Sequence, residues 1–285
     1  MHMAQAEAII NPPRRKLIIE KRSSRFDMNW SELWEYRELG CVLIWRDITV
    51  RYKQTAIGIA WVLLQPLIAM LIFTAVFGKM AKVPSDGVWY PVFSLTALLP
   101  WMYFSQAVTR AGESVVANGR MVGKIYFPRL WLPLATVVSP LVDFALSLVL
   151  LFGLLIYAGM PLTWKVLTLP AFILLAVFTA MGLCFFTSAL HVKYRDVGHA
   201  IPFVMQIWMY LTPIVYPASL VPDEWKWLYG LNPMVGVVEG FRWALLGRTS
   251  PDPVMMMESL VVLFAVIAGG LVYFRKMERQ FADII

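Results

Sequence analysis

Six stretches of this sequence run for about 20 residues with almost no charged side chain. A helix that crosses the hydrocarbon core of a bilayer needs roughly 20 mainly apolar residues, because each residue advances it by about 1.5 Å. Apolar residues make up 59% of the 285-residue chain and charged residues only 15%, which is not the composition of a water-soluble domain. The sequence therefore predicts an all-α integral membrane protein with six transmembrane helices, expected at about 56–77, 88–109, 132–157, 166–190, 197–217 and 253–274.

The basic residues are divided unevenly between the two sides of these stretches. Ten Lys and Arg residues precede the first stretch, four lie in 110–129, two in 191–196 and three after Phe274, so alternate segments hold 19 of the 25. Cations resist translocation, so cation-rich segments stay in the cytoplasm. We expect both termini to be cytoplasmic, with a flexible tail at 1–29 and a single transmembrane domain at 30–285. The net charge of +7 then reflects topology and attraction to anionic lipid rather than nucleic-acid binding.

Residues 30–54 have the pattern of an amphipathic helix. Tryptophan and aliphatic side chains recur there at helical spacing, opposite charged residues, and Ser31 is available as an N-cap. Such a helix lies in the membrane interface with its indole rings at the level of the lipid headgroups. The pattern fits a simple membrane anchor and a role in gating or substrate entry equally well.

Two connections between the expected spans also carry helical patterns. Residues 118–129 are short, basic and amphipathic and end beside a proline, which predicts a brief cytoplasmic helix whose apolar and basic side chains invite a protein partner. An ordinary connecting loop is the alternative. On the opposite side, 222–247 holds two pieces that break at Asn232 and are each too short or too charged to span. We expect two re-entrant outer-face helices, with Glu239 and Arg242 paired because they are three residues apart.

The sequence contains no recognisable catalytic or metal-binding pattern. Its three histidines have no metal-ligand spacing, and Cys41 and Cys184 are not expected to form a disulfide. No phosphate loop of the type GxxxxGK[ST] is present, so this chain is not expected to hydrolyse ATP by that route. The energy for any transport would come from another subunit or from an ion gradient.

Five blocks of sequence carry a family resemblance. They are LWEYRELGCVLIWRDITVRYKQTAIGIAWVLLQPL (33–67), KIYFPRLWLP (124–133), HVKYRDVGHAIPFVMQIWMYLTPIVYP (191–217), LNPM (231–234) and FRKMERQFADII (274–285). In this order they resemble the membrane subunit of bacterial ATP-binding-cassette exporters of surface polysaccharides, such as the O-antigen, capsule and teichoic-acid permeases. The resemblance runs from Trp30 to the end of the sequence, and the first block is its most specific part.

The resemblance implies an assembly in the bacterial cytoplasmic membrane. Two copies of this six-span subunit would pair with two copies of a separate nucleotide-binding subunit, which would hold ATP and Mg, so no cofactor is expected in this chain. A glycan carried on a polyprenyl diphosphate lipid would pass through a channel between the two copies. In such families the flat amino-terminal helix lies at the entrance, the helix between spans two and three docks into the ATPase, and the paired outer helices gate the exit.

These roles select a set of candidate residues. A diphosphate headgroup would be met at the entrance by Arg51, because a guanidinium binds phosphate oxygens in pairs, together with Arg46, Lys53 and Gln65. The ATPase-docking residues would be Arg120, Lys124, Tyr126, Phe127 and Arg129. Channel or exit aromatics would be Trp101, Tyr103, Trp208, Tyr210, Tyr216, Trp225 and Trp227, although an interfacial aromatic belt explains any single ring more simply. For Gln65, helix packing through an internal hydrogen bond is an equal alternative.

Asp143 is the one carboxylate that sits deep in an expected span, about 15 Å from its start at 1.5 Å per residue. Neutralisation by a hydrogen bond or an ion pair between helices is favoured over a direct role in transport. A single such residue gives thin support to an ion-coupled secondary transporter, which would also show inverted repeats. An integral-membrane enzyme acting on a lipid-linked sugar would need partnered acid-base residues. Export of a small molecule or lipid by the same superfamily stays open.

Overall fold

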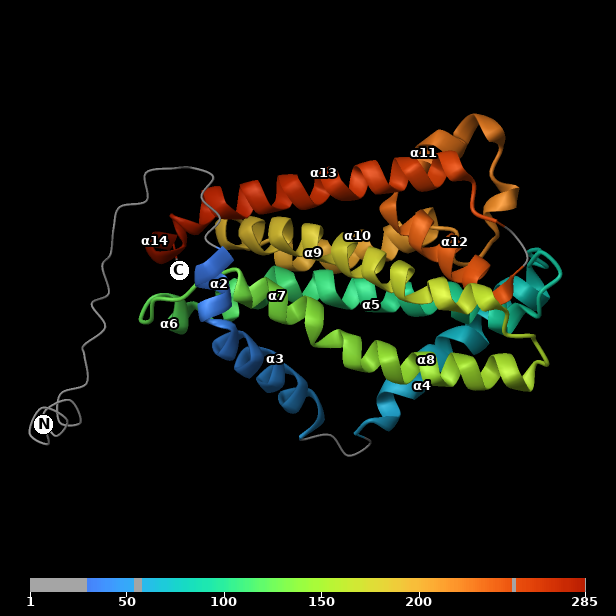
Figure 1. Cartoon of the computed structure of the whole chain (residues 1–285), viewed down its shortest axis with the longest axis horizontal. Helices are drawn as coiled ribbons and strands as arrows, with labels where there is room; N and C mark the ends of the chain where they lie inside the picture. The colour runs from blue at the N-terminus through green and yellow to red at the C-terminus, as the bar shows by residue number, and fades with distance from the viewer. Residues whose placement is uncertain (1–29, 54–57, 248–249, 285) are drawn as a thin grey trace, which may run out of the picture.

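The computed structural model describes residues 30–53, 58–247 and 250–284. Every regular element among these residues is helical, and the long helices form an elongated bundle (Figure 1). Four helical segments are long and apolar enough to cross a membrane, namely 60–80, 131–157, 164–193 and 253–278. The prediction of an all-helical membrane protein is confirmed over the described residues, and the expected tail at 1–29 lies outside them.

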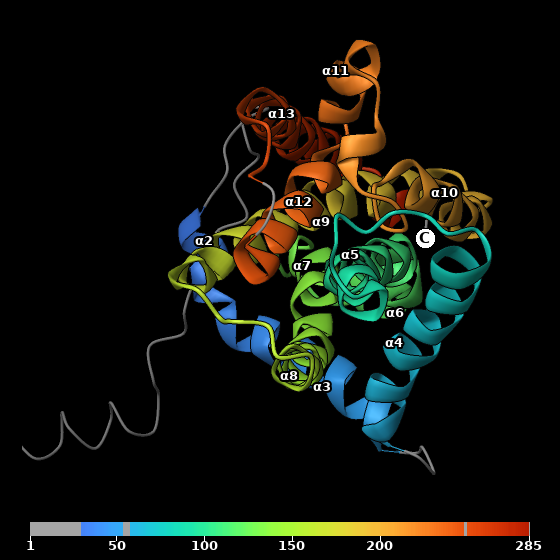
Figure 2. The ribbon, with the colours of Figure 1, turned by 90° about the vertical axis from the view of Figure 1, so that its right-hand side faces the viewer.

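Two of the six expected spans, 88–109 and 197–217, are not among those four segments. The helix α5 (Tyr90–Ala117) has 28 residues and is less apolar, but 20 of them are buried, and it runs through the middle of the bundle in the end-on view of Figure 2. A central helix contacts other helices rather than lipid, so polar residues are tolerated along it. The helix α10 (Val197–Leu211) has only 15 residues. A total of six membrane crossings therefore remains a prediction.

The amino-terminal part of the structure forms a V beside the bundle (Figure 1). Its elements are α2 (Trp30–Glu35) and α3 (Arg37–Tyr52), which slant away from the bundle, and α4 (Ala60–Phe73), which slants back and continues as the π-helical η1 (Thr74–Met80). The helix α3 packs closely on Trp131 at Gly40, where any Cβ would overlap the indole ring. Trp34 on α2 and Trp45 on α3 are exposed. A position of these helices in the membrane interface remains a prediction.

The third expected span is broken near one end. It consists of α7 (Trp131–Val138) and α8 (Pro140–Tyr157), separated at Ser139. Pro140 has no N–H to donate to the carbonyl one turn earlier, and the chain bends there (Figure 1). The bend directs α8 along a different line from α7, and α8 faces α4 and α5.

Two other long helices pack against each other. They are α9 (Leu169–Lys193), which follows the short η2 (Trp164–Thr168), and α13 (Pro253–Glu278), which leads into α14 (Phe281–Ile284). Gly182 and Gly270 face each other, and a Cβ on Gly270 would overlap the carbonyl oxygen of Gly182. Small residues allow helix backbones to approach closely inside membranes.

The predicted short helices are only partly as expected. Residues 118–129 contain just one helical turn, α6 (Gly119–Val122), because it begins at Gly119, is followed by Gly123, and cannot extend through Pro128. The 222–247 region breaks near Asn232 as predicted, giving η4 (Asp223–Trp225) and α11 (Lys226–Gly230) before α12 (Pro233–Leu246), with η3 (Ala218–Leu220) ahead of them. Eleven of the 14 residues of α12 are buried, so this helix belongs to the core rather than to an exposed gate.

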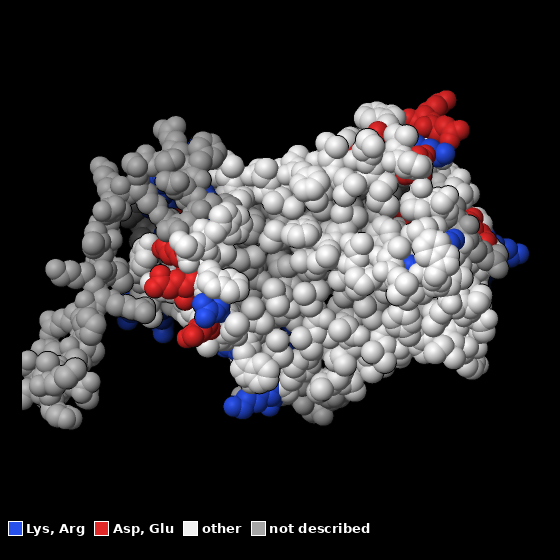
Figure 3. Space-filling view, in the orientation of Figure 1, with Lys and Arg blue, Asp and Glu red and all other residues white. Residues whose placement is uncertain are grey.

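The buried apolar side chains form two clusters. The larger surrounds α5 and includes Phe93, Phe104 and Phe241. The smaller joins α3, α7 and the end of α13, and it includes Phe127 and Phe281. On the face shown in Figure 3, Lys, Arg, Asp and Glu lie at the two ends of the molecule and along α3, with a wide uncharged surface between them. Such a band is the surface that a bilayer requires.

Candidate functional site

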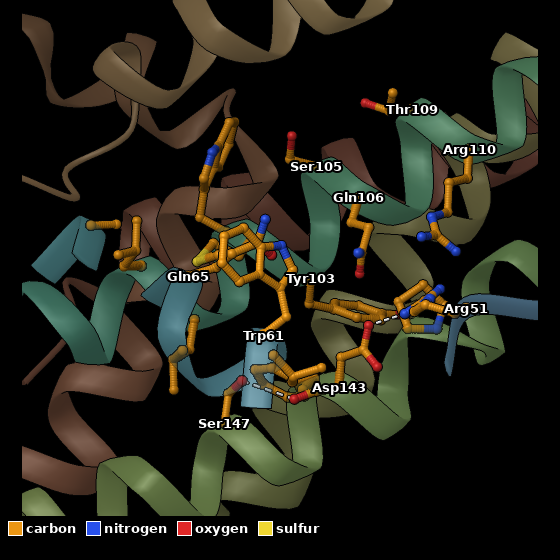
Figure 4. Close-up of a pocket in the computed structure, with 18 of the residues that line it drawn as sticks. Arg51, Trp61, Gln65, Tyr103, Ser105, Gln106, Thr109, Arg110, Asp143 and Ser147 are labelled. Atoms are coloured by element: carbon orange, nitrogen blue, oxygen red, sulfur yellow. Dashed lines mark hydrogen bonds and ion pairs between the residues drawn. The ribbon is translucent and has the colours of Figure 1, made fainter. Parts of the chain in front are cut away.

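A cavity of about 780 Å³ lies between the V and the bundle. Its walls come from the end of α3 and from α4, α5 and α8. Trp61 and Gln65 on α4 line the cavity and are themselves exposed, so this is the side on which the cavity opens. Most of its surface is apolar, but one wall carries charged and amide side chains (Figure 4). A site with this mixture suits a ligand that has an anionic group and an apolar part.

The polar wall is centred on Asp143. The guanidinium Nη1 of Arg51 and the phenol hydroxyl of Tyr52 both donate to its carboxylate, one to each oxygen. The side chains of Arg51 and Asp143 are each 13% exposed. The expected neutralisation of Asp143 by an ion pair between helices is therefore seen, and its partner is the very arginine predicted to meet a headgroup.

Local structure explains why these residues meet. Arg51 and Tyr52 are the last two residues of α3, where the slant of the helix brings it against α8. Asp143 lies in the first turn of α8, just after the bend at Pro140. A carboxylate is favoured there because the first backbone N–H groups of a helix carry a partial positive charge.

Arg51 is incompletely paired in this arrangement. Its Nε and Nη2 are buried and have no hydrogen-bond partner among the residues that the structure describes. Burial, and secondarily repulsion by the nearby Arg110, lowers the pKa of the Arg51 guanidinium to about 10. Arg51 nevertheless stays protonated at neutral pH, so the cavity wall holds two cations and one carboxylate.

The second cation comes from α5 and was not among the predicted site residues. Figure 4 shows Arg110 and Gln106 pointing from α5 toward Arg51 and Asp143. Among the described residues, Arg110 forms no ion pair. The sequence carries a signal for this face, because Gln106 and Arg110 are four residues apart and project from the same side of a helix.

The other predicted entrance residues lie in different places. Gln65 lines the cavity, directly before Pro66, which α4 accommodates without ending. Lys53 caps the end of α3 and is exposed. Arg46 lies outside the cavity, where it pairs with Asp47 at 2.9 Å and donates to the amide oxygen of Asn118 at 2.8 Å. Only Arg51 and Gln65 of this group therefore belong to the cavity wall.

The predicted docking residues are divided between surface and core. Arg120, Lys124 and Tyr126 are exposed, as is the neighbouring Ile125. Phe127 is only 4% exposed and packs in the smaller apolar cluster, so it is a core residue rather than a contact for a partner.

Arg129 is also engaged within the chain. Its guanidinium donates to the backbone carbonyl of Glu278, and its backbone N–H donates to the carboxylate of the same residue. Tyr126 donates to the carboxylate of Glu32 at 2.7 Å, which ties this loop to α2. The exposed surface formed by Arg120, Lys124, Ile125 and Tyr126 is called the basic loop surface below.

The predicted channel aromatics also separate into groups. Trp101 and Tyr103 are 3% exposed and lie in the core, although both reach the cavity wall. Trp208 is half-buried and packs on Trp101, with ring centroids 6.5 Å apart. The hydroxyl of Tyr216 pairs with that of Tyr229. The exposed rings of the predicted set are Tyr210, Trp225 and Trp227.

A second arginine–carboxylate pair lies at the other end of the bundle. Arg242 and Glu239 form the predicted ion pair at 2.9 Å. Arg242 also donates to the carbonyl oxygens of Ile214 at 3.0 Å and Tyr216 at 3.3 Å, and its guanidinium stacks 3.8 Å from the centre of the Phe93 ring. This arginine fastens the segment after α10 to α12.

The described residues contain no group of three or more His, Cys, Asp or Glu side chains placed to hold a metal ion. Cys41 and Cys184 are both free thiols, as expected. The guanidinium and amide groups in the cavity wall are donors that can bind an anion.

Comparison with known proteins places these features in a family. The profile of the ABC-2 type transporter family matches residues 38–246, which include every helix around the cavity. The O-antigen export system permease protein RfbA of Myxococcus xanthus is 29% identical over 260 residues, covering 89% of this chain and 98% of that protein. RfbA of Klebsiella pneumoniae is 27% identical, covering 87% and 95%. The polysialic acid transport protein KpsM of Escherichia coli is 25% identical, covering 83% and 92%.

Proposed function

The chain belongs to the ABC-2 type transporter family, and from this premise we propose that it is the permease subunit of an ATP-binding-cassette exporter of bacterial surface polysaccharide. The observation that carries the proposal is the nature of its relatives. Proteins named for O-antigen export or polysialic acid transport match this chain over 83% to 89% of its length and at least 92% of theirs. End-to-end similarity of this kind favours a shared transport role over a shared fold alone.

The proposed location is the bacterial cytoplasmic membrane, with both termini in the cytoplasm. The described ends of the chain, α2 and α14, lie at the same end of the bundle as α6 (Figure 1). The segments assigned to the cytoplasm hold 19 of the 25 basic residues, which the positive-inside rule favours. Counting α5 and α10 with the four long apolar segments gives six crossings, an even number that agrees with both termini on one side.

The proposed energy source is a separate ATPase subunit, which would hold ATP and Mg. Two copies of the permease would assemble with two copies of that ATPase. The basic loop surface is the proposed docking site, because exposed Ile125 and Tyr126 beside cations suit a protein partner better than water. Since Phe127 and Arg129 are engaged in the core, the docking proposal no longer includes them.

The proposed substrate is a polysaccharide carried on a polyprenyl diphosphate. Its headgroup would enter at the cavity between α3, α4, α5 and α8, where Arg51 and Gln65 line the wall and Lys53 lies exposed at the tip. Aromatic rings at the other end, such as Trp225 and Trp227, would contact the sugars on their way out, because aromatic faces hold sugars without sequence preference.

The function is tested in cells that lack the gene. Complementation with the full chain should restore surface polysaccharide, detected on intact cells with an antibody or lectin. A cell that keeps its surface polysaccharide without this gene would rule out the proposed function, and accumulation of a small lipid or drug instead would favour the other export role of the superfamily. Purified permease alone should show no ATP hydrolysis, and activity should require the ATPase subunit.

Docking is tested separately by reversing charge on the basic loop surface. Arg120→Glu together with Lys124→Glu should reduce co-purification with the ATPase, while the variant still inserts into the membrane. Lys79→Glu, a charge reversal at an exposed position of η1 at the other end of the bundle (Figure 1), is the control and should leave co-purification unchanged. Wild-type co-purification by the double variant would remove the docking role from this surface.

A further inference from the structure

The ion pair in the cavity has features that a purely structural pair does not need. Arg51 uses one guanidinium nitrogen on Asp143 and leaves its other two buried without partners. Arg110 faces the same space from α5, and Figure 4 shows both guanidinium groups on the same side of the cavity. Buried donors without acceptors are unfavourable. Asp143 is the carboxylate in the cavity wall beside the two cations, and Asp47 acts on both of them from outside the wall. The cavity wall therefore has hydrogen-bond donors from which an anion could accept.

The carboxylate of Asp143 occupies the place that an anionic ligand would take. A carboxylate and a phosphate present similar oxygen acceptors to a guanidinium. We propose that the contact of Arg51 and Tyr52 with Asp143 is an exchangeable latch: a diphosphate group entering the cavity displaces Asp143, bridges Arg51 and Arg110, and so releases the end of α3 from α8. This inference rests on the proposed function, in which the headgroup is a diphosphate.

The charges favour a diphosphate over a single phosphate ester. Two cations that come from different helices are neutralised together by an anion with charged oxygens on two phosphorus atoms. Repulsion between Arg51 and Arg110, which contributes to the lowered pKa of Arg51, would be relieved when such an anion lies between them. Gln106 supplies an amide on the same face of α5.

The latch links ligand binding to a movable element. Arg51 and Tyr52 are the final residues of α3, and their contacts with Asp143 join this end of the helix to α8. A ligand shifts a conformational equilibrium only by binding one state better than the other. Here the released state offers the ligand all three guanidinium nitrogens of Arg51, whereas in the latched state Nη1 is held by Asp143.

The test uses the full-length protein in lipid nanodiscs. Binding of radiolabelled geranylgeranyl diphosphate is measured by scintillation proximity, with geranylgeranyl monophosphate and inorganic pyrophosphate as competitors. Asp143→Asn removes the competing charge and should tighten diphosphate binding by about tenfold, whereas Arg110→Gln should weaken it by about tenfold. Arg37→Gln removes a cation at the opposite end of α3 and should bind as the wild type does.

A second variant keeps the test sound if Asp143→Asn folds poorly. Tyr52→Phe retains every charge but loosens the latch, so it should tighten binding by about threefold. Backbone hydrogen exchange at residues 48–52 of the wild type should be faster with the diphosphate bound than without it. In Asp143→Asn and Tyr52→Phe it should be faster than in the wild type even without ligand.

The outcomes separate this inference from the proposed function. The latch is overturned if the wild type binds geranylgeranyl diphosphate but Tyr52→Phe and a folded Asp143→Asn bind no more tightly, or if Arg110→Gln binds equally well. Absence of binding of both diphosphate probes also overturns it. If pyrophosphate binds as tightly as geranylgeranyl diphosphate and responds in the same way to the variants, that result would support the latch and contradict the proposal that the substrate is linked to a lipid.

Discussion

Arg51 and Arg242 are both paired with a carboxylate in a mainly apolar protein, yet their surroundings differ. Arg242 is 6% exposed and contacts a carboxylate, two backbone carbonyls and an aromatic ring. Arg51 is 13% exposed, faces a cavity, and uses one nitrogen on Asp143 while two have no partner. Arg242 leaves only its Nε without a hydrogen-bond partner among the described residues and borders a space of about 20 Å³, whereas Arg51 leaves two nitrogens unpaired beside a cavity of about 780 Å³.

Arg242 therefore makes a fixed structural contact, whereas the contact of Arg51 with Asp143 can be replaced. Arg242 joins α12 to the segment around Ile214 and Tyr216, and any change leaves several acceptors unpaired at once. Arg51 can exchange its one acceptor for another without rearranging the core. We therefore expect a substitution of Arg242 to lower stability most and a substitution of Arg51 to lower transport most, although both residues are paired with acids.

The largest expected effect is on Arg242. Arg242→Gln removes one partner of a buried ion pair and should destabilise the fold by about 3 to 5 kcal/mol. The measurements are the thermal unfolding midpoint of the purified protein and its level in the membrane. Lys226→Gln, which breaks the exposed pair with Asp223 at the same end, is the control and should leave the midpoint unchanged. An Arg242→Gln protein as stable as the wild type would show that Arg242 is no more important to the fold than Arg51.

A substitution of Arg51 should reduce export more than it reduces stability. Arg51→Gln should cost about 1 to 2 kcal/mol of stability, because water in the cavity can solvate Asp143, but it should abolish most export. Arg51→Lys keeps the charge and loses the paired geometry, so export should fall to an intermediate level. Surface polysaccharide is measured at matched membrane levels, with Arg37→Gln as control. Wild-type export by Arg51→Lys would indicate that Arg51 only anchors α3 to anionic lipid.

Tyr52→Phe should give the smallest change. It deletes one hydrogen bond to Asp143 and should cost about 0.5 to 1.5 kcal/mol. A double-mutant cycle with Asp143→Asn should show coupling between the two residues, because they share one contact. Additive effects of the two substitutions would argue that the hydrogen bond does not hold α3 to α8.

Prediction from sequence succeeded where the signal is local. The long apolar segments, the break at Asn232 and the pair Glu239–Arg242 all depend on residues close in sequence. It failed for the docking helix, since glycine and proline reduce 118–129 to one turn. It also assigned Phe127 to the surface, because a pattern of apolar residues beside cations does not reveal which of them is covered by α13 and α14.

The sequence by itself determined that this chain is helical and built for a membrane, because the length and hydropathy of each segment are properties of consecutive residues. Only the tertiary structure decided which charges meet. Asp143 is 92 residues from Arg51 along the chain, and Arg110 lies on a third helix; their shared cavity depends on the bend at Pro140 and on the slant of α3. No local pattern encodes such a meeting, because it results from the packing of four helices at once.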